Sequence, residues 1–494
     1  MPLSYNFPFI SVFVCMVAAI LLSIVRGAKS SYYVTLLVSI ACAVLGFIFL
    51  FDIVRDDTAF AFTMGKFAAP FGNEIKAGPL QALMCSVFSA VMALALMGGK
   101  KELFEDVDGH KMGLAGVMYC MVLASILVLS YTNDAFTSYV FIEISTIAAC
   151  ALVMIKDSGP TLVATIRYLF MSLLGSGLFL FSVILLYGMT GHLLMPQISE
   201  KVAELMTAGD QRLLLAVCLA SMAASLGIKS AMFPFHRWLP DAHGTATTSS
   251  SAVLSGLVLK GYCMLMILFF CRVFTLDTVR QFHVNDAVFI LGLVGMIMGS
   301  VGAMRESHAK RMLAYSSVAQ LGYVFMGIGL GTVAGIAAAC FQMLAHACTK
   351  SLLFVSVGRL ASTTGHDKEL SALRGSAWNA PLAGIGFAVG ALSMVGIPLF
   401  GGFAAKVFFA SASIADAEKI VLVLAVLAVS SVLNALYYIP ALIGIWSHKR
   451  PAVHKAERDV SCAVAISGLC LGIFVLGIGF SPIMDIIVRG IELL

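Results

Sequence analysis

Long apolar runs alternate with short polar connections along almost all of the 494 residues. Each run is close to the roughly 20 residues that an α-helix needs to cross the hydrocarbon core of a bilayer. The runs lie at about 7–25, 32–53, 79–97, 114–132, 134–155, 162–187, 213–232, 248–271, 287–304, 311–330, 333–357, 380–413, 420–446 and 461–481. The pattern predicts an all-α membrane protein of about 14 transmembrane helices. The loop at 54–78 is rich in glycine and aromatic residues, and we expect a hairpin there.

The composition agrees with a membrane protein. Hydrophobic residues form 60% of the chain and charged residues only 12%, whereas about a quarter of the residues in soluble domains are charged. The net charge of +5 is small and scattered. These values exclude a soluble enzyme, a disordered protein and a nucleic-acid binder, and they make the lipid bilayer the expected surroundings.

Basic residues predict how the chain lies in the membrane. Connections with odd numbers, such as those holding Lys29, Lys100 and Lys101, carry about twice as many Lys and Arg as those with even numbers, and basic loops stay in the cytoplasm. We therefore expect a multi-pass protein of the cytoplasmic membrane with both termini on the outer, periplasmic side.

Five basic residues lie inside the predicted spans: Arg167, Lys229, Lys260, Lys350 and Lys406. A Lys or Arg at the bilayer centre costs at least about 2.5–3.5 kcal/mol, so such residues are usually functional. One alternative is that Lys260 or Lys406 extends to the membrane surface. Arg167 lies close to the start of its span, and there we expect an anchor at the cytoplasmic surface.

Two spans contain helix breakers next to a lysine. Span 7 reads LAASLGIKSAMFPFHRWLPDAH, and span 12 reads GALSMVGIPLFGGFAAKVFF. Broken helices at comparable positions of two halves are typical of transporters built from inverted repeats. We predict an N-terminal three-helix segment with a periplasmic-side loop (1–110), a first five-helix repeat (111–275), an inverted second repeat (284–447) and a C-terminal helix (448–494).

The buried ionisable groups suggest a proton relay. A buried lysine loses its charge readily unless a carboxylate stabilises it, and Glu143 lies near the middle of span 5. We expect Glu143 to pair with Lys229, and breaking the pair would send the proton to Lys260. His346 and Lys350 are four residues apart on one helix face, so the proton would pass through either before reaching Lys406.

Other readings of these residues stay open. His346 alone is more often a packed histidine, Lys350 is a candidate structural partner, and the polar stretch of span 10 (YSSVAQLGY) equally suits helix packing. His236, Asp241 and His243 are residue types that bind metal ions, but they lie in an irregular turn that contains Trp and Pro, where a metal site is the less favoured explanation. The 12 cysteines contain no CxxC motif, so we expect no metal centre or redox cofactor in this chain.

At these motifs the sequence resembles the antiporter-like membrane subunits shared by respiratory complex I, energy-converting membrane-bound hydrogenases and Mrp sodium/proton antiporters. The similar segments are FIEIS in helix 5, GIKSAMFPFHRWLPDAH in helix 7, LVLKGY in helix 8, MLAYSSVAQLGYVFMG in helix 10, LAHACTKSLLFVSVGRL in helix 11 and GIPLFGGFAAKVFF in helix 12. They run from about 115 to 410 in the family's order. One departure is that helix 8 begins without the proline that the family usually has there.

The resemblance implies roles for the matching residues. Glu143 and Lys229 would be the input pair, Lys260 the central relay and Lys406 the exit, with His346 and Lys350 lining the connection between halves. A lysine at 406 resembles the Mrp D type and the chain 2 or chain 5 type of complex I better than the chain 4 type. The implied function is proton translocation, with or without Na⁺, in a redox-driven complex whose Fe–S or NiFe centres lie in partner subunits, membrane or soluble. The alternative is a subunit of a Mrp-type Na⁺/H⁺ antiporter.

Overall fold

A computed structural model of the chain describes residues 3–25, 27–63, 67, 72–414, 416–448 and 458–494. In these residues, thirteen helices are long and apolar enough to cross a membrane. They are α1 (Phe7–Ile24), α2 (Ala28–Arg55), α3 (Pro79–Gly98), α5 (Met112–Tyr131), α6 (Ala135–Met154), α7 (Gly159–Thr190), α9 (Arg212–Lys229), the segment Thr248–Val273, α14 (Val284–Met304), α15 (Ala309–Gly329), α16 (Val333–Ala361), α19 (Ile420–Ile445) and α20 (Val460–Ile478). The one remaining predicted crossing, span 12, is divided into α17 (Pro381–Val395) and α18 (Gly401–Ser413). The predicted fold class is confirmed.

The two predicted helix breaks are present. α9 ends at Lys229, and the chain continues through Pro234 into a 3₁₀ turn, η4 (Phe235–Arg237), and then α10 (Trp238–Thr245). α17 ends at Val395, and Gly396 follows in the left-handed region with φ +95°. Each break therefore ends a regular helix beside a lysine or across from one, as the Gly and Pro positions predict.

Span 8 contains a further irregularity that the sequence did not predict. It consists of α11 (Thr248–Val253), a π turn η5 (Leu254–Val258), α12 (Leu259–Leu268) and a second π turn η6 (Phe269–Val273). Single π turns inside helices are common at functional sites. α11 begins without a proline because Thr247 caps it, accepting a hydrogen bond from the Ser250 amide.

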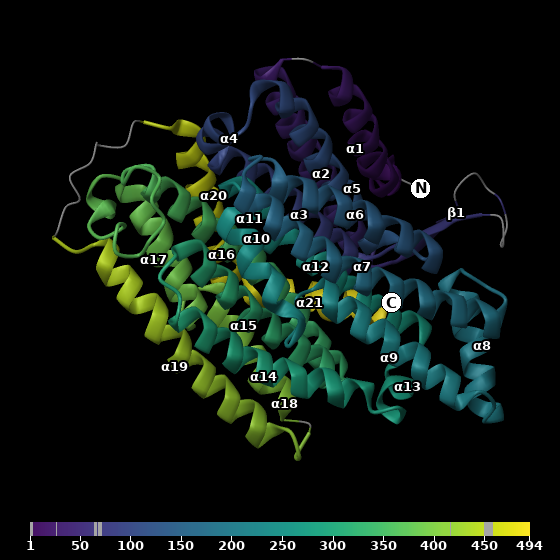
Figure 1. The fold of residues 1–494 in the computed structure, drawn as a ribbon. Helices are drawn as coiled ribbons and strands as arrows, with labels where there is room; N and C mark the ends of the chain where they lie inside the picture. Colours follow the sequence, from purple (N-terminus) through teal and green to yellow (C-terminus); the bar gives the residue numbers. More distant parts are fainter. Residues whose placement is uncertain (1–2, 26, 64–66, 68–71, 415, 449–457) are drawn as a thin grey trace.

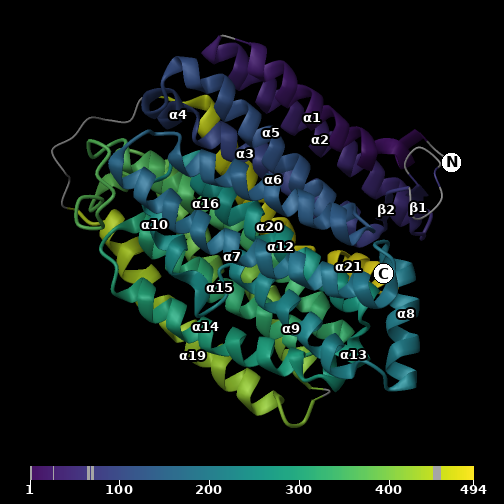
Figure 2. The same cartoon turned by 45° about the vertical axis from the view of Figure 1, so that its right-hand side comes forward.

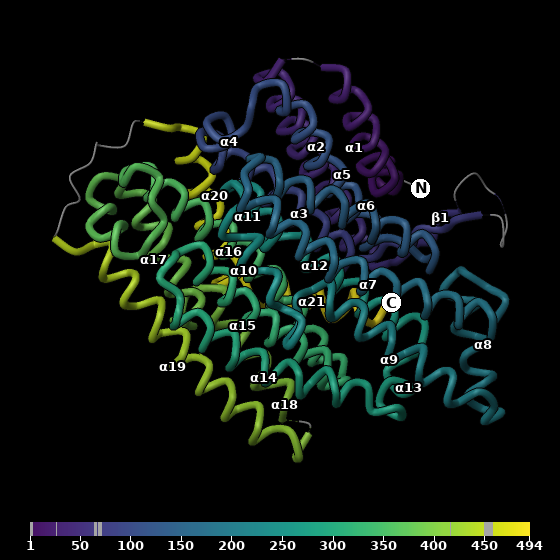
Figure 3. The backbone as a smooth tube through the Cα atoms, viewed as in Figure 1, coloured from purple at the N-terminus to yellow at the C-terminus, as the bar shows by residue number. Residues whose placement is uncertain are grey.

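The helices form a bundle with a polar-lined centre and apolar edges. The segment 248–273 and α16 are buried along their apolar length. α1 and α2 lie at one edge of the bundle and α19 at the opposite edge (Figures 1 and 2), and the tube in Figure 3 follows α19 along that edge. The edge helices expose Leu, Ile, Val and Phe side chains, as expected of surfaces that face lipid.

Two connections have structure of their own. β1 (Phe60–Thr63) pairs antiparallel with β2 (Glu74–Ala77), so the predicted hairpin is confirmed in the described residues, while residues 64–66 and 68–71 lie outside them. The connection predicted at 188–211 holds a helix, α8 (Met195–Ala208), which forms because Met195, Ile198 and Val202 share one buried face.

Both ends of the chain lie on one face of the bundle. The Ser4 hydroxyl donates to Asp52 and the Tyr5 hydroxyl to Asp56, both at the end of α2. On the same turn, Arg489 of the terminal helix α21 (Phe480–Glu492) forms an ion pair with Asp57 at 2.7 Å. Both ends lie on one face because the chain crosses the bundle an even number of times. β1 and β2 lie on the same face.

Candidate functional site

Three of the four predicted lysines lie in or next to irregular parts of the helices, and Lys350 lies within a regular helix. Lys229 ends α9, Lys260 is in α12 directly after η5, Lys350 is in α16 and Lys406 is in α18. Lys229, Lys260 and Lys350 are at most 1% exposed, and Lys406 is half-buried. The buried lysine side chains therefore do not extend to the membrane surface.

Lys229 is held by a hydroxyl of α6. Its Nζ donates to Thr146 Oγ1 at 2.6 Å, and the Thr146 hydroxyl donates to the carbonyl of Ile142 at 2.8 Å. Because the threonine proton is engaged, a lone pair of its oxygen faces the ammonium. The Tyr262 ring lies 5.9 Å from the same Nζ.

Glu143 lies one helical turn from Thr146 but makes no ion pair with Lys229 in the described part of the chain. It is close enough to Lys229 to interact electrostatically, and its Oε1 is buried without a hydrogen-bond partner. The structure thus brings the two predicted input residues to the same site without joining them. Glu143 has an acceptor oxygen without a partner, and the nearby Lys229 is bonded to the Thr146 hydroxyl. A movement of the side chains can therefore transfer the Lys229 ammonium from Thr146 to Glu143.

Lys260 is bonded to a backbone carbonyl of the π turn that precedes it. Its Nζ donates to the carbonyl of Ser255, within η5. The Ser255 hydroxyl and Ser317 of α15 are 2.9 Å apart, which connects the helix carrying Lys260 to the second half of the chain. Lys260 and Lys350 both interact electrostatically with His346.

His346 and Lys350 share a face of α16, as predicted, but differ in their bonding. Both ring nitrogens of His346 are buried without a hydrogen-bond partner in the described residues. Lys350 Nζ donates to the carbonyl of Leu313 at 2.9 Å and to the Tyr438 hydroxyl at 3.0 Å. Lys350 is therefore bonded to both α15 and α19.

Lys406 lies across the gap of the second broken helix. Its Nζ donates to the carbonyl of Val395 at 2.6 Å, the last residue of α17, and to Ser431 of α19 at 2.7 Å. The Ser431 hydroxyl donates to its own helix at Leu427. As at Lys229, a lysine beside a helix break is held by a hydroxyl whose proton is already engaged.

The polar stretch of span 10 is part of this site. Ser316, Ser317, Gln320 and Tyr323 of α15 each hydrogen-bond to another helix: Ser316 and Tyr323 to α19, Ser317 to η5 and Gln320 to Gln342 of α16. These bonds serve helix packing and also join the polar groups of the two halves, so the two readings of this stretch do not exclude each other.

A charged cluster near the ends of α4 (Lys100–Asp106) and α11 was not predicted. Lys310, assigned from sequence to a loop, is fully buried at the start of α15 and donates to the carbonyls of Ala246 and Thr247. Glu102 accepts from Thr248 and, at 2.7 Å, from Lys368. Burial raises the pKa of Glu102, but Lys368 and Lys310 outweigh it and lower the pKa to about 2. The sequence feature that could have predicted this cluster is the run KKELFEDVD, whose acidic residues need basic partners. Those partners are distant in the sequence.

Arg167, Asp241, His236 and His243 make other contacts. Asp241 forms ion pairs with Arg167 at 2.5 Å and Arg311 at 2.7 Å. His243 is buried against the Phe354 ring, and His236 stacks on Phe233. In the residues that the structure describes, no three His, Cys, Asp or Glu side chains are grouped as metal ligands would be.

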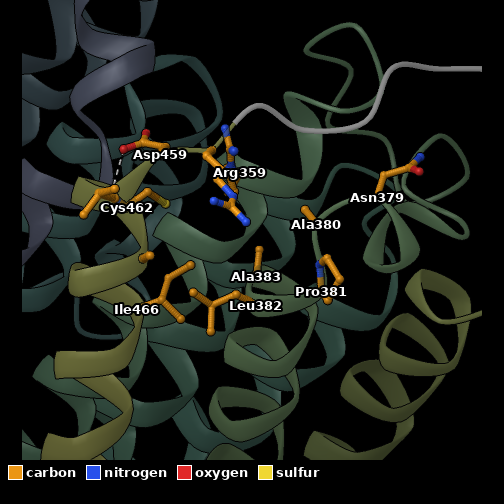
Figure 4. A pocket seen from close by; sticks show the side chains of 12 residues that line it. Arg359, Asn379, Ala380, Pro381, Leu382, Ala383, Asp459, Cys462 and Ile466 are labelled. Atoms are coloured by element: carbon orange, nitrogen blue, oxygen red, sulfur yellow. Dashed lines mark hydrogen bonds between the residues drawn. The ribbon is translucent and has the colours of Figure 1, made fainter.

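A surface cavity of about 370 Å³ lies apart from these lysines (Figure 4). Arg359, Asn379 and Pro381 line it together with Asp459, which accepts a hydrogen bond from the Cys462 amide at 3.0 Å. None of the six predicted site residues lines this cavity. The candidate site is instead the interior row of lysines.

Comparison with known proteins agrees with this geometry. Residues 132–433 match the family described as NADH:quinone oxidoreductase/Mrp antiporter, transmembrane region. The chain belongs to this family. Subunit N of the NADH-quinone oxidoreductase of Desulforudis audaxviator is 31% identical over an alignment of 439 residues that covers 85% of this chain and 85% of its own. The antiporter subunit mnhD2 of Staphylococcus aureus is 28% identical over 76% of this chain and 74% of its own length.

Chains of three solved membrane complexes share the fold. A chain of the Mrp complex from Dietzia has a TM-score of 0.87 at 22% identity, covering 100% of this chain and 97% of its own. A chain of the archaeal membrane-bound sulfane sulfur reductase has a TM-score of 0.85 at 23% identity, with coverage of 99% and 96%. Complex I from Thermus thermophilus gives 0.75 at 21%, with coverage of 97% and 100%. This chain is thus an antiporter-like membrane subunit by family and by fold.

Proposed function

We propose that this subunit moves protons through a row formed by Glu143, Lys229, Lys260, His346, Lys350 and Lys406. The observation that carries the proposal is the bonding of the four lysines, each of which donates to a hydroxyl or a carbonyl. A buried ammonium without a carboxylate partner is costly and gives up its proton readily. Neighbouring groups that can gain and lose a proton are what a relay requires.

The cycle begins at Glu143 and Lys229. When Glu143 approaches the ammonium, the charged lysine is stabilised; when it withdraws, the proton leaves toward Lys260. Moving one charge against 100 mV costs about 2.3 kcal/mol. A change in one buried ion pair is of that size, so a conformational change at the broken α9 suffices to drive a step.

We place the subunit in a redox-driven, multi-subunit complex of the cytoplasmic membrane, with both termini on the outer side. Its likeness to an NADH-quinone oxidoreductase subunit supports this setting. The partners are other membrane subunits and soluble redox subunits that carry Fe–S or NiFe centres, and this chain holds no redox cofactor. The likeness to an antiporter subunit supports the alternative, a Na⁺/H⁺ antiporter of the Mrp type.

Proton translocation tests the relay. The whole complex is assayed in membrane vesicles with a pH-gradient dye, energised by NADH, reduced ferredoxin or a Na⁺ gradient, whichever supports the wild type. We expect Lys229→Ala to abolish the gradient. Lys201→Ala, which removes a half-exposed lysine of α8 that pairs with Glu204 at 2.7 Å, should not change it. A wild-type rate in Lys229→Ala would show that the relay is wrongly assigned.

Purification of the complex in mild detergent separates the two settings. We expect partners that contain iron, and nickel in the case of a hydrogenase, by mass spectrometry and metal analysis. Metal-free partners that are all small membrane proteins would replace the redox setting with the antiporter.

A further inference from the structure

α19 has the reverse of the amphipathic pattern found in soluble proteins. Its outer face exposes Leu, Ile and Val side chains at the edge of the bundle (Figure 1). Its inner face carries a column of polar residues at helical spacing: Ser430, Ser431, Asn434, Tyr437 and Tyr438. All are buried except Ser431, which is half-buried. Polar groups in a lipid-exposed helix are costly and mark function, and none of these residues is in the relay proposed above.

The upper end of the column begins at Lys350. Its Nζ donates to the Tyr438 hydroxyl at 3.0 Å, and that hydroxyl lies 2.8 Å from Ser316 Oγ of α15. The Tyr437 hydroxyl is 3.0 Å from the same Ser316 Oγ. One serine hydroxyl therefore joins the two tyrosines, and through Tyr438 it joins them to Lys350.

The middle of the column contains a hydroxyl with two acceptors. The Tyr437 hydroxyl donates either to Ser316 Oγ at 3.0 Å or to Asn434 Oδ1 at 2.5 Å. Since a hydroxyl has one proton, it can serve only one of these acceptors at a time. Rotation about the C–O bond moves the proton between the Lys350 side and the Asn434 side. Asn434 is fixed for this role, because its amide donates to the carbonyl of Met394.

The lower end of the column reaches Lys406. The Asn434 amide bonds to Met394, and Lys406 bonds to the next carbonyl, that of Val395. Lys406 also donates to Ser431, one turn before Asn434 on α19. Tyr437 and Ser431 are six residues apart, which is about 9 Å along the helix axis. Ser300, whose hydroxyl is 3.5 Å from Asn434 Oδ1, adds a polar group to this interval.

His346 offers no comparable connection. It lies on the same helix as Lys350, but both of its ring nitrogens are buried without a partner in the described residues. A proton passes along hydrogen bonds, and the bonds that leave Lys350 toward Lys406 run through Tyr438, Ser316 and Tyr437. The two routes thus make different predictions about which hydroxyls matter.

We propose that the column of α19 carries protons between Lys350 and Lys406, with Tyr438, Ser316 and Tyr437 as relay hydroxyls and Asn434 as a positioning residue. The inference rests on the proposed function. At each relay oxygen one O–H bond forms with the arriving proton while the existing O–H bond gives its proton to the next acceptor. Each hydroxyl is neutral after the transfer and rotates to reset. The route requires a water molecule between Asn434 and Ser431 to complete the interval to Lys406.

The test removes the two tyrosine hydroxyls and keeps their rings. We expect Tyr437→Phe/Tyr438→Phe to slow translocation by the whole complex about tenfold or more. Tyr168→Phe is the matched control, because Tyr168 is a buried tyrosine whose hydroxyl has no hydrogen-bond partner among the described residues, and its rate should equal that of the wild type. Assembly is monitored by the amount of complex in the membrane.

The outcomes separate this proposal from the one that it rests on. A wild-type rate in the double variant, with Lys229→Ala inactive, would overturn the α19 route and leave the proton relay in place. A wild-type rate in Lys229→Ala would overturn both. If the double variant does not assemble, Ser316→Ala removes the hydroxyl that both tyrosines contact; slowed translocation supports the route and a wild-type rate refutes it.

Discussion

Each of the four lysines Lys229, Lys260, Lys350 and Lys406 donates to hydroxyl or carbonyl oxygens, and none forms an ion pair within the described residues. Lys229 and Lys406 each donate to a hydroxyl whose own proton is bound to the preceding turn of its helix. The hydroxyl is thereby held as an acceptor for the ammonium. Such a site stabilises the charged lysine enough to hold it but leaves the proton free to move.

Thr146 tests this arrangement. Thr146→Val keeps the shape of the side chain and removes the acceptor of Lys229. A hydrogen bond to a charged group contributes about 1.5–3 kcal/mol, so translocation should fall by roughly tenfold or more. Thr165→Val is the control, because among the described residues the Thr165 hydroxyl bonds to its own helix, at the carbonyl of Thr161. Equal rates for Thr146→Val and the wild type would show that the hydroxyl does not hold the proton-carrying form.

Glu102 gives a prediction about stability and pH. Its carboxylate holds Lys368 and Thr248 across three segments, and its pKa is lowered from 4.5 to about 2. A lowered carboxyl pKa contributes stability that is complete above pH 4.5 and is lost as the pH falls toward 2. At pH 7, Glu102→Gln should destabilise the protein by about 3 kcal/mol, because it leaves Lys368 without its counterion.

Thermal unfolding in detergent measures this effect. The difference between Glu102→Gln and the wild type should shrink steadily between pH 4.5 and 2. Glu105→Gln, at an exposed position near Lys101 and His366, should change little at any pH. A destabilisation of Glu102→Gln that does not depend on pH would contradict the role given to the charge.

At the residue scale, the sequence identified the buried lysines because a charge inside an apolar run is conspicuous. It did not identify Lys310, since a lysine next to a basic loop looks like part of that loop. The Tyr and Ser column of α19 was also missed. Hydroxyls are common in transmembrane helices as packing groups, and only the neighbouring helices show that this column faces Lys350 and Lys406.

At the scale of elements, the breaks in α9 and between α17 and α18 followed from Gly and Pro in the sequence. The π turn before Lys260 did not follow from the sequence, since no proline marks it. Its single glycine, Gly256, is explained by helix packing. A Cβ at Gly256 would lie 2.5 Å from Ser351 Oγ, so the glycine allows α16 to approach closely. Two five-helix repeats remain our proposal, in which helix 8 with Lys260 and helix 13 with the polar column are each the fifth helix.

The turn at Gly396 supplies a prediction about the second break. Gly396 has φ +95°, and a Cβ there would lie 2.8 Å from Lys406 Nζ. Gly396→Ala should lower the stability by about 1–2 kcal/mol through backbone strain, and it should also slow translocation by displacing Lys406. Gly191 is the control, because it has φ +73° and a methyl group there would meet open space. Gly191→Ala should therefore lower the stability and leave translocation unchanged. The same translocation rate in both variants would show that Lys406 tolerates displacement.

At the scale of the whole molecule, the fold places both termini, β1 and β2 on one face. The excess of basic residues in the odd-numbered connections predicts that this face is outside. Family membership agrees with the fold and with the order of the motifs that the sequence displayed.

Labelling with a maleimide that does not cross membranes tests the orientation. Asp210→Cys, in the connection after α8, should react in intact cells, whereas His366→Cys, in the connection after α16, should react only after the membrane is opened. Unmodified protein gives the background, since ten of its 12 cysteines are buried. The reverse pattern would invert the assigned topology.

The central claim is that the lysines of the two halves form one path. The most direct measurement compares translocation by Lys229→Ala, Lys406→Ala and the variant carrying both. Residues that act as one unit are strongly non-additive, so each single change should abolish translocation and the second should add nothing. If the two halves were separate channels, each single variant would keep part of the wild-type rate, and the double variant would have a lower rate than either. That result would contradict a single path through the molecule.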